Sequence, residues 1–255
     1  EQKIGYAAIN AIPRKMIFET VREVCQLGEY KGKLFIQIHV PEGSRLAKKT
    51  FNPRLGIEGG ISILGTSGIL EPMSEKAIVD TIELEIRQKK AMGKERILVT
   101  PGNYGKSYAT KYLGLDMESS IKCSNYIGET LDLAVTYDIK QLLLVGNIGK
   151  LVKLAAGIMN THSKVADARC EVFVAYAGLC GGTRECLEQI MECKNTDEML
   201  EVLEKEDLKE TVLEQICKRI HEQVAHRVGE EFEFGIMLFS EKYGFLGQTK
   251  DAGKV

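Results

Sequence analysis

Histidine is scarce in this chain of 255 residues, which contains only four, and none of its seven cysteines forms a C-x-x-C pair. Neither a zinc site nor a thioredoxin-like redox motif of the usual spacing is therefore indicated. The cysteine count is odd, so a complete disulfide framework is not indicated either. In a chain of this length the cysteines are typical of small buried residues in a reducing compartment, and we expect a cytoplasmic protein.

Long apolar runs and a charge excess are also missing. No run approaches the roughly 20 residues that cross a bilayer, and no signal peptide is visible. The net charge of −2 gives no sign of a protein that binds nucleic acid or an anionic membrane. We therefore expect a small-molecule ligand, with any anion held by a local group of basic side chains.

The usual nucleotide motifs are absent too. The chain has neither G-x-G-x-x-G nor G-x-x-x-x-G-K-[ST], which counts against a nicotinamide-dependent oxidoreductase and against ATP hydrolysis. Three other glycine-rich loops are present, at residues 65–68, 101–105 and 146–150, and each follows a short apolar run. Glycine after a strand lets a ligand approach the backbone closely, so three such loops favour a ligand cleft over three simple tight turns.

The apolar runs at residues 61–64, 97–99 and 142–145 alternate with segments of helical periodicity. This pattern predicts an α/β fold with a Rossmann-like, mostly parallel sheet and helices on both faces. The three loops would then share the edge formed by the carboxyl ends of the strands. Helices are predicted around residues 183–193, 197–204 and 212–228, and one more strand at residues 234–239.

The first 55 residues read differently from the remainder. Pro13 can open a helix that Gly28 ends, and residues 34–40 alternate between apolar and mixed positions as in a half-covered strand. We therefore divide the chain into residues 1–55, an α+β region, and residues 56–255, a Rossmann-like domain with a helical C-terminal part.

Polar segments lie between the loops. In residues 123–129, Ser124 or Asn125 can cap the following helix, which alone would explain that segment. Residues 160–163 and 167–169 fit a solvated loop or a site equally well. His162 is the histidine we select for a functional role.

Residues 52–74 (NPRLGIEGGISILGTSGILEPMS) closely resemble the signature of the cobalt-precorrin-5B C1-methyltransferases, enzymes of anaerobic vitamin B12 synthesis. Shorter stretches support the resemblance, namely residues 8–10, 13–17, 100–105, 123–125, 149–154 and 160–163. Family members usually carry a further N-terminal region, so the resemblance implies a shortened chain. Residues 1–55 would then be a remnant of an N-terminal α+β domain.

The resemblance implies methyl transfer from S-adenosylmethionine to C1 of a cobalt-bearing corrin precursor, cobalt-precorrin-5B. The cobalt arrives with this substrate, so no metal site of the protein is needed. The alternative is a non-catalytic module that binds a nucleotide or a tetrapyrrole. A homodimer is compatible with the sequence, although no feature demands one.

The resemblance assigns no catalytic residues, so the site residues are expectations from chemistry. The donor-binding candidates, in or near the glycine-rich loops, are Thr66, Ser67, Gly68, Gly102, Asn103 and Gly105, with Glu71, Asp116 and Glu129 as carboxylates for the ribose hydroxyls. The basic candidates for the acetate and propionate arms of the substrate are Arg54, Lys106, Lys150, Lys153 and Arg169. His162 is the candidate base for any proton removed after methylation.

Overall fold

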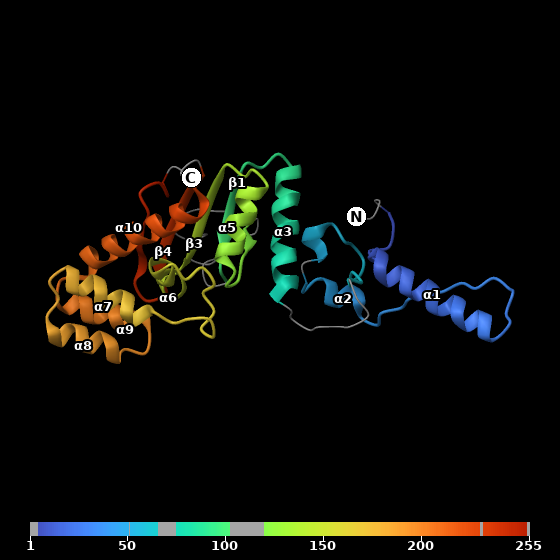
Figure 1. Cartoon of the computed structure of the whole chain (residues 1–255), viewed down its shortest axis with the longest axis horizontal. Helices are drawn as coiled ribbons and strands as arrows, with labels where there is room; N and C mark the ends of the chain where they lie inside the picture. Colours follow the sequence, from blue (N-terminus) through green and yellow to red (C-terminus); the bar gives the residue numbers. More distant parts are fainter. Residues whose placement is uncertain (1–4, 51, 66–74, 103–119, 230–231, 254–255) are drawn as a thin grey trace. The chain divides into compact units, whose positions relative to one another are not determined.

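The computed structural model describes residues 5–50, 52–65, 75–102, 120–229 and 232–253. The chain forms two compact units, Glu1–Ser74 and Glu75–Val255. Each unit is considered by itself below (Figure 1). In the described residues no helix is long and apolar enough to cross a membrane.

The first unit is mostly helix and irregular backbone. It contains α1 (Ala11–Leu27), α2 (Gly43–Ala47) and the 3₁₀ helix η1 (Asn52–Leu55). The predicted first helix is confirmed, with Pro13 in its first turn, where a missing N–H costs nothing, and Gly28 as its C-cap. No residue of α1 is buried.

Two strand predictions in the first unit are wrong. Residues 34–40 lie exposed and outside any strand, and residues 61–64 form only a single parallel bridge, between Ile9 and Ile63. Alternating hydrophobicity selects a face but supplies no neighbouring strand, and in the described parts of the chain no strand pairs with residues 34–40. The glycine-rich loop that begins at Gly65 therefore does not follow a strand of the sheet, contrary to the prediction.

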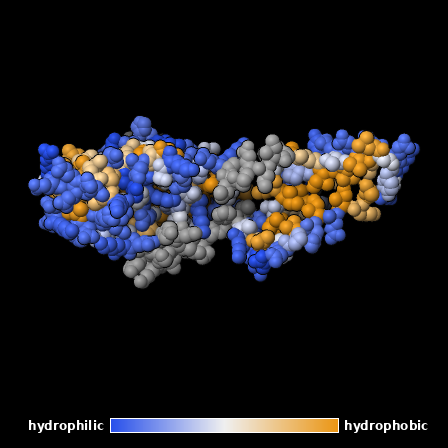
Figure 2. All heavy atoms as spheres, turned by 90° about the horizontal axis from the view of Figure 1, so that it is seen from below, coloured by the Kyte–Doolittle hydropathy of each residue, from blue (hydrophilic) through white to orange (hydrophobic). Residues whose placement is uncertain are grey.

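Large apolar side chains remain exposed across this unit. Phe35 is 96% exposed, Leu27 83% and Phe18 61%. Figure 2 shows the corresponding broad hydrophobic areas over the first unit. Monomeric proteins rarely leave so many large apolar groups in water, so the exposed apolar surface of this unit is unusual.

The second unit is built on a five-stranded sheet. Its strands are β1 (Arg96–Thr100), β2 (Ile121–Lys122), β3 (Gln141–Asn147), β4 (Glu233–Ser240) and β5 (Gly244–Gln248), in the order β2-β1-β3-β4-β5. All neighbours are parallel except β4 and β5. The runs predicted at residues 97–99, 142–145 and 234–239 are thus confirmed as strands of a mostly parallel sheet.

Helices follow the strands and pack on them. They are α3 (Glu75–Ala91), α5 (Ile127–Thr136), α6 (Ile148–Leu151), η3 (Val152–Ala156), α7 (Arg169–Leu179), α8 (Arg184–Glu192), α9 (Thr196–Lys205) and α10 (Lys209–Val228). In α3, Ile82 and Ile86 are buried and Ile78 packs beside them, so these residues form its core-facing side. The helices predicted in the last third correspond to α8, α9 and α10.

The two faces of the sheet belong to different clusters. Leu142 and Leu144 of β3 lie in the large core to which each of these helices contributes. Leu143 and Val145 point to the other face and pack in a small cluster with Ala252. In the described parts of the chain the helices therefore gather on the first cluster, and coverage of both faces stays a prediction.

Gly235 makes that second face possible. A Cβ on Gly235 would lie 2.4 Å from the Cα of Ala252, closer than backbone atoms tolerate. We expect Gly235→Ala to lower the free energy of unfolding by about 1–3 kcal/mol through overpacking. Urea denaturation measures this, with Gly253→Ala as the control, because a Cβ there would only reach Gln248 at 3.8 Å. Equal stability of the two variants would contradict the packing.

His221 of α10 stacks on Phe234 of β4, with ring centroids 4.8 Å apart. Burial lowers the pKa of His221 below its ordinary 6.5, and Lys250 adds to this while Asp251 and Glu222 oppose it. The unfolded chain then binds a proton more readily than the folded chain. Stability is therefore full above about pH 6.5 and falls as the pH drops from there through the lowered pKa.

Urea midpoints between pH 7.5 and 5 test this dependence. His221→Gln should flatten the loss of stability on acidification, since the half-buried imidazole is gone. His226→Gln, at an exposed position of the same helix, should leave the profile of the native chain unchanged. A profile that is the same for the native chain and His221→Gln would rule out His221 as the source.

Candidate functional site

The candidate site lies where the chain direction reverses in the sheet. The chain leaves β1 toward β2 on one side, and β3 lies on the other side of β1. In such sheets a crevice opens between the carboxyl ends of the two diverging strands. Two of the predicted glycine-rich loops, after β1 and after β3, are therefore neighbours at this edge, as predicted.

Glycine allows these two loops to touch. A Cβ on Gly146, near the end of β3, would lie 2.8 Å from Cγ of Pro101 and 2.9 Å from Cδ1 of Leu151. Beside Pro101, the Cβ position of Gly102 faces open space with no described atom within 4 Å. The two loops are thus in contact at Gly146, whereas the Cβ position of Gly102 has no neighbour among the described residues.

Lys150 bridges the loops. Its Nζ donates to the carbonyl oxygen of Pro101 at 3.1 Å and to Oδ1 of Asn125, in the loop after β2, at 2.9 Å. Burial lowers the pKa of Lys150, nearby Lys153 lowers it further, and Cys123 opposes the shift. The ammonium therefore joins the loops that follow three neighbouring strands.

The loop after β2 departs from the sequence prediction. Neither Ser124 nor Asn125 caps α5; the N-cap is Tyr126, without a side-chain bond. Ser124 adopts a left-handed φ of 54°, and the side chain of Asn125 turns to Lys150 instead of the helix. The N-cap prediction is wrong because a local pattern cannot anticipate a partner 25 residues away.

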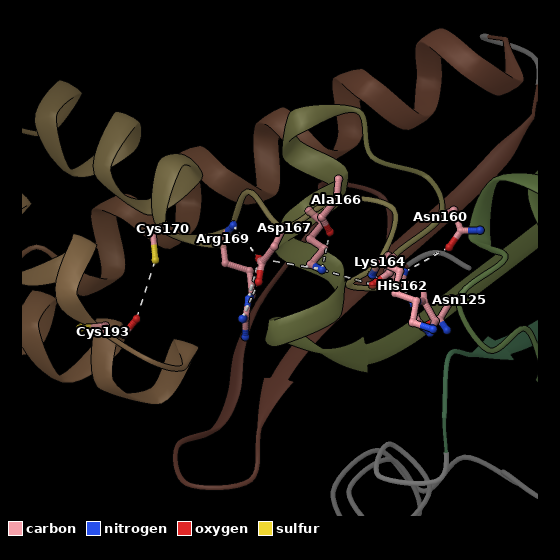
Figure 3. Close-up of polar contacts among 11 residues, drawn as sticks. Asn125, Asn160, His162, Lys164, Ala166, Asp167, Arg169, Cys170 and Cys193 are labelled. Carbon is pink, nitrogen blue, oxygen red and sulfur yellow. Dashed lines mark hydrogen bonds and ion pairs between the residues drawn. The ribbon is translucent and has the colours of Figure 1, made fainter.

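A second lysine organises the segment from Asn160 to Arg169 (Figure 3). The side chain of Lys153 is only 4% exposed, and its Nζ donates to the carbonyls of Ala166 at 2.9 Å and Thr161 at 3.3 Å. Oδ1 of Asp167 lies 3.9 Å from the same nitrogen. The buried charge is thus surrounded by oxygens of one loop, which it holds in place.

Asp167 and Arg169 form a bidentate pair in the same loop. Nε of Arg169 donates to Oδ1 at 2.8 Å, and Nη2 donates to Oδ2 at 2.6 Å. These bonds are the main reason why the pKa of Asp167 falls to about 2. Arg169 is therefore held in a fixed position, and its Nη1 donors have no acceptor among the described residues.

His162 projects from this loop and is exposed. Its Nδ1 accepts the backbone N–H of Lys164 at 3.0 Å. A neutral imidazole in this contact carries its hydrogen on Nε2, so the ring presents a donor to its surroundings. The neighbouring Thr161 joins the loop to the crevice, because its N–H donates to the carbonyl of Asn125 at 3.0 Å.

The structure brings some predicted residues together and leaves others undescribed. One connected region contains Gly102 and Lys150. Thr161 joins to it the loop that carries His162 and Arg169, and Lys153 is buried beneath that loop. Glu129 lies in the first turn of α5, half-buried. The predicted residues outside the described parts are Thr66, Ser67, Gly68, Glu71, Asn103, Gly105, Lys106 and Asp116, and the side chain of Arg54 is likewise not described.

Three residues of this region were missed by sequence reasoning. Asn125 was assigned only as a possible cap, and Thr161 and Asp167 were noted only as parts of polar segments. Cys123 lies beside Lys150, but burial raises its pKa to about 12, which makes it an inert core thiol rather than a nucleophile. All seven cysteines are free.

Known proteins match almost the whole chain. A family model described as CbiD matches residues 1–72, and one described as CbiD, C-terminal domain, matches residues 160–250. A protein of Thermosipho africanus named cobalt-precorrin-5B C(1)-methyltransferase is 42% identical over 247 residues, which are 97% of this chain and 68% of that protein. The chain belongs to the cobalt-precorrin-5B C(1)-methyltransferase family.

Other members of the family share this name. The relative from Ruminiclostridium cellulolyticum is 50% identical over 238 residues, covering 93% of this chain and 62% of the relative. That from Alkaliphilus metalliredigens is 40% identical over 252 residues, covering 99% and 66%. The chain thus spans about two thirds of the length of these relatives. No solved structure matches it.

Proposed function

We propose that the chain methylates C1 of cobalt-precorrin-5B with S-adenosylmethionine as the donor, in anaerobic cobalamin synthesis. The observation that carries this proposal is the sheet edge where β1 and β3 diverge, at which Lys150 donates hydrogen bonds to the carbonyl of Pro101 and to the side chain of Asn125. Family membership supplies the reaction, and the crevice supplies a place for two reactants to meet.

The donor fits the β1 loop by its chemistry. It carries no phosphate, so a loop without a phosphate motif suits it, and Gly102 leaves space for close approach. We propose that the carboxylate of Glu129, which lies in the described part of the chain, binds the ribose hydroxyls of the donor. Asp116 and Glu71 are the other candidates. When bound, the donor supplies a methyl group on a sulfonium, which the ring carbon takes up as the sulfur keeps the bonding electron pair.

The protein's part is alignment and charge. Holding two reactants in line can contribute several kcal/mol to a displacement of this kind. We propose that Lys150, whose two acceptors are neutral, binds a carboxylate arm of the substrate by charge, and that Arg169, whose charge is balanced by Asp167, adds hydrogen bonds from its remaining donors. Lys153, whose ammonium is bonded inside the fold, would support their loop rather than touch the substrate.

His162 remains the proposed base for a proton released after methylation. Its Nδ1 accepts the Lys164 amide, so the neutral ring would have to exchange tautomers or give up this bond before it takes up a proton. This condition predicts that the same residue first serves as a hydrogen-bond donor from Nε2.

A transfer assay with radiolabelled donor tests the proposal. We expect label in the tetrapyrrole with the native chain, and a raised KM for the tetrapyrrole in the double variant Lys150→Ala, Arg169→Ala. Binding of both ligands without transfer would instead favour the alternative, a tetrapyrrole-binding module without catalysis. An unaltered KM in the double variant would remove both cations from the substrate site.

We also propose that residues 56–255 form a Rossmann-like, doubly wound domain and that residues 1–55 belong to an N-terminal α+β domain. The strand order β2-β1-β3-β4 supports the doubly wound assignment. Seven free cysteines support a cytoplasmic location, where thiols stay reduced.

Finally, we propose a homodimer formed through α1 and residues 34–40. The alternating segment lacks a strand partner among the described residues, and two copies can pair it about a two-fold axis while covering Phe18 and Phe35. Light scattering should give a dimer for the native chain and a monomer for Phe18→Asp, Phe35→Asp. Leu179→Asp, at an exposed site of the second unit, should stay dimeric. A monomeric native chain would overturn this proposal.

A further inference from the structure

Asn125 directly follows a residue with a strained backbone conformation, and its side chain does not cap the helix that comes after it. The residue before it, Ser124, holds a left-handed φ of 54°, which costs free energy for a side chain with a Cβ. The following helix starts at Ile127 without using the Asn125 side chain as a cap. Strain of this kind persists where surrounding contacts require it, and here those contacts are made by Asn125.

The Asn125 amide oxygen receives two donors. Nζ of Lys150 donates to Oδ1 at 2.9 Å, and Oγ1 of Thr161 donates to it at 3.4 Å. An amide oxygen has two lone pairs, so these two donors saturate it. The position of the Lys150 ammonium is therefore fixed from one side by Asn125 and from the other by the carbonyl of Pro101.

One N–H donor of the Lys150 ammonium is not used by the described residues. Of its three N–H groups, two are used by Pro101 and Asn125, and the third has no acceptor among the residues that the structure describes. Both fixed acceptors are neutral, so the full positive charge of Lys150 is available to a ligand. Among the described residues, Lys153 is the charged side chain that acts on Lys150, and as a like charge it increases the attraction for an anion.

We propose that Asn125 is a positioning residue, which directs the free N–H of Lys150 to a carboxylate of the tetrapyrrole and keeps that charge uncompensated by being an amide. This inference rests on the proposed function, which supplies a substrate with acetate and propionate arms. It predicts that an aspartate at position 125, with the same shape, impairs binding because it pairs with Lys150 and neutralises it.

Asn125→Asp gives the sharpest test, because it changes charge and little else. The probes are a cobalt corrinoid with free carboxylate arms and the same corrinoid with its arms amidated, titrated by absorbance against the intact chain. We expect Asn125→Asp to weaken binding of the free-acid corrinoid about tenfold, because one charge-assisted contact is lost. Binding of the amidated corrinoid should stay unchanged. Equal effects on both probes, or none, would overturn the proposal.

A double-mutant cycle separates positioning from a structural role. Lys150→Met alone should weaken binding of the free-acid corrinoid about tenfold. In the Asn125→Leu background the same substitution should weaken it by less than about twofold, because Asn125 no longer positions the ammonium. Additive effects would mean that Asn125 does not act through Lys150. Lys140→Met, an exposed lysine at the amino end of β3, is the matched control and should be additive with Asn125→Leu.

The two proposals can fail separately. A chain that binds the free-acid corrinoid with the expected dependence on Asn125 yet transfers no methyl group would overturn the proposed function alone. A chain that transfers the methyl group with a KM unaffected by Asn125→Asp would overturn the role of Asn125 alone. If Asn125→Leu does not fold, the near-isosteric Asn125→Asp decides the matter by itself.

Discussion

Gly146→Ala is expected to lower kcat/KM for methyl transfer about a hundredfold, the order of loss that follows a displacement of about 1 Å in an aligned site. The new Cβ would lie 2.8 Å from Cγ of Pro101 and 2.9 Å from Cδ1 of Leu151. Because Leu151 is fully buried, the strain is relieved chiefly by moving the Pro101 loop. That movement also displaces the carbonyl that holds Lys150.

Steady-state kinetics and urea denaturation together test this prediction. The overpacking should also cost about 1–3 kcal/mol in the free energy of unfolding, so assays belong at a temperature where the variant is folded. Gly178→Ala is the control, because a Cβ there meets only Cδ1 of Leu187 at 3.7 Å within a helix. A folded Gly146→Ala with native kcat/KM would show that contact between the two loops does not matter for the reaction.

Lys153→Met is expected to lower the free energy of unfolding by about 2 kcal/mol, although it removes a buried charge. Two effects compete here. Losing the ammonium removes its desolvation penalty, but it leaves the carbonyls of Thr161 and Ala166 without their donor. We expect the loss of hydrogen bonds to outweigh the relief of desolvation, because two carbonyl oxygens lose their donor at once. The loop from Asn160 to Arg169 also loses the side chain around which it is arranged.

Urea denaturation of Lys153→Met measures the net balance. Lys140→Met is the control, since that lysine is exposed and paired only with Asp138, and its loss should change stability by less than about 1 kcal/mol. Hydrogen exchange should quicken in residues 160–169 of Lys153→Met. A variant as stable as the native chain, with unchanged exchange there, would mean that the ammonium does not hold this loop.

The sheet was predictable from the sequence because its strands carry their own signal. The runs at residues 97–99 and 142–145 are continuously apolar, since Ile97, Val99 and all of residues 142–145 are buried, and each run is followed by a glycine-rich turn. The edge strands β2 and β5 carry no such run; β2 has two residues, and β5 is only partly buried. Their pairing depends on neighbours that a local pattern cannot identify.

Failures elsewhere have the same physical origin. Residues 34–40 alternate like a strand, yet a strand exists only where another segment accepts its hydrogen bonds. Asn125 has the chemistry of a helix cap, yet Lys150 binds it from the loop after another strand. Lys150 and Arg169 were predicted from charge alone, whereas the burial of Lys153 depends on the fold of the loop around it. Local chemistry predicts candidates, and long-range contacts decide among their roles.

Hydrogen exchange with S-adenosylhomocysteine tests the central claim most directly, because it locates the donor without any substitution. If the crevice between β1 and β3 holds the donor, the amides of residue 102 and of residues 146–151 should become protected, while α8 and α9 exchange as before. Protection confined to α8 and α9, or saturating ligand that protects no amide at this edge, would contradict the assignment of the site.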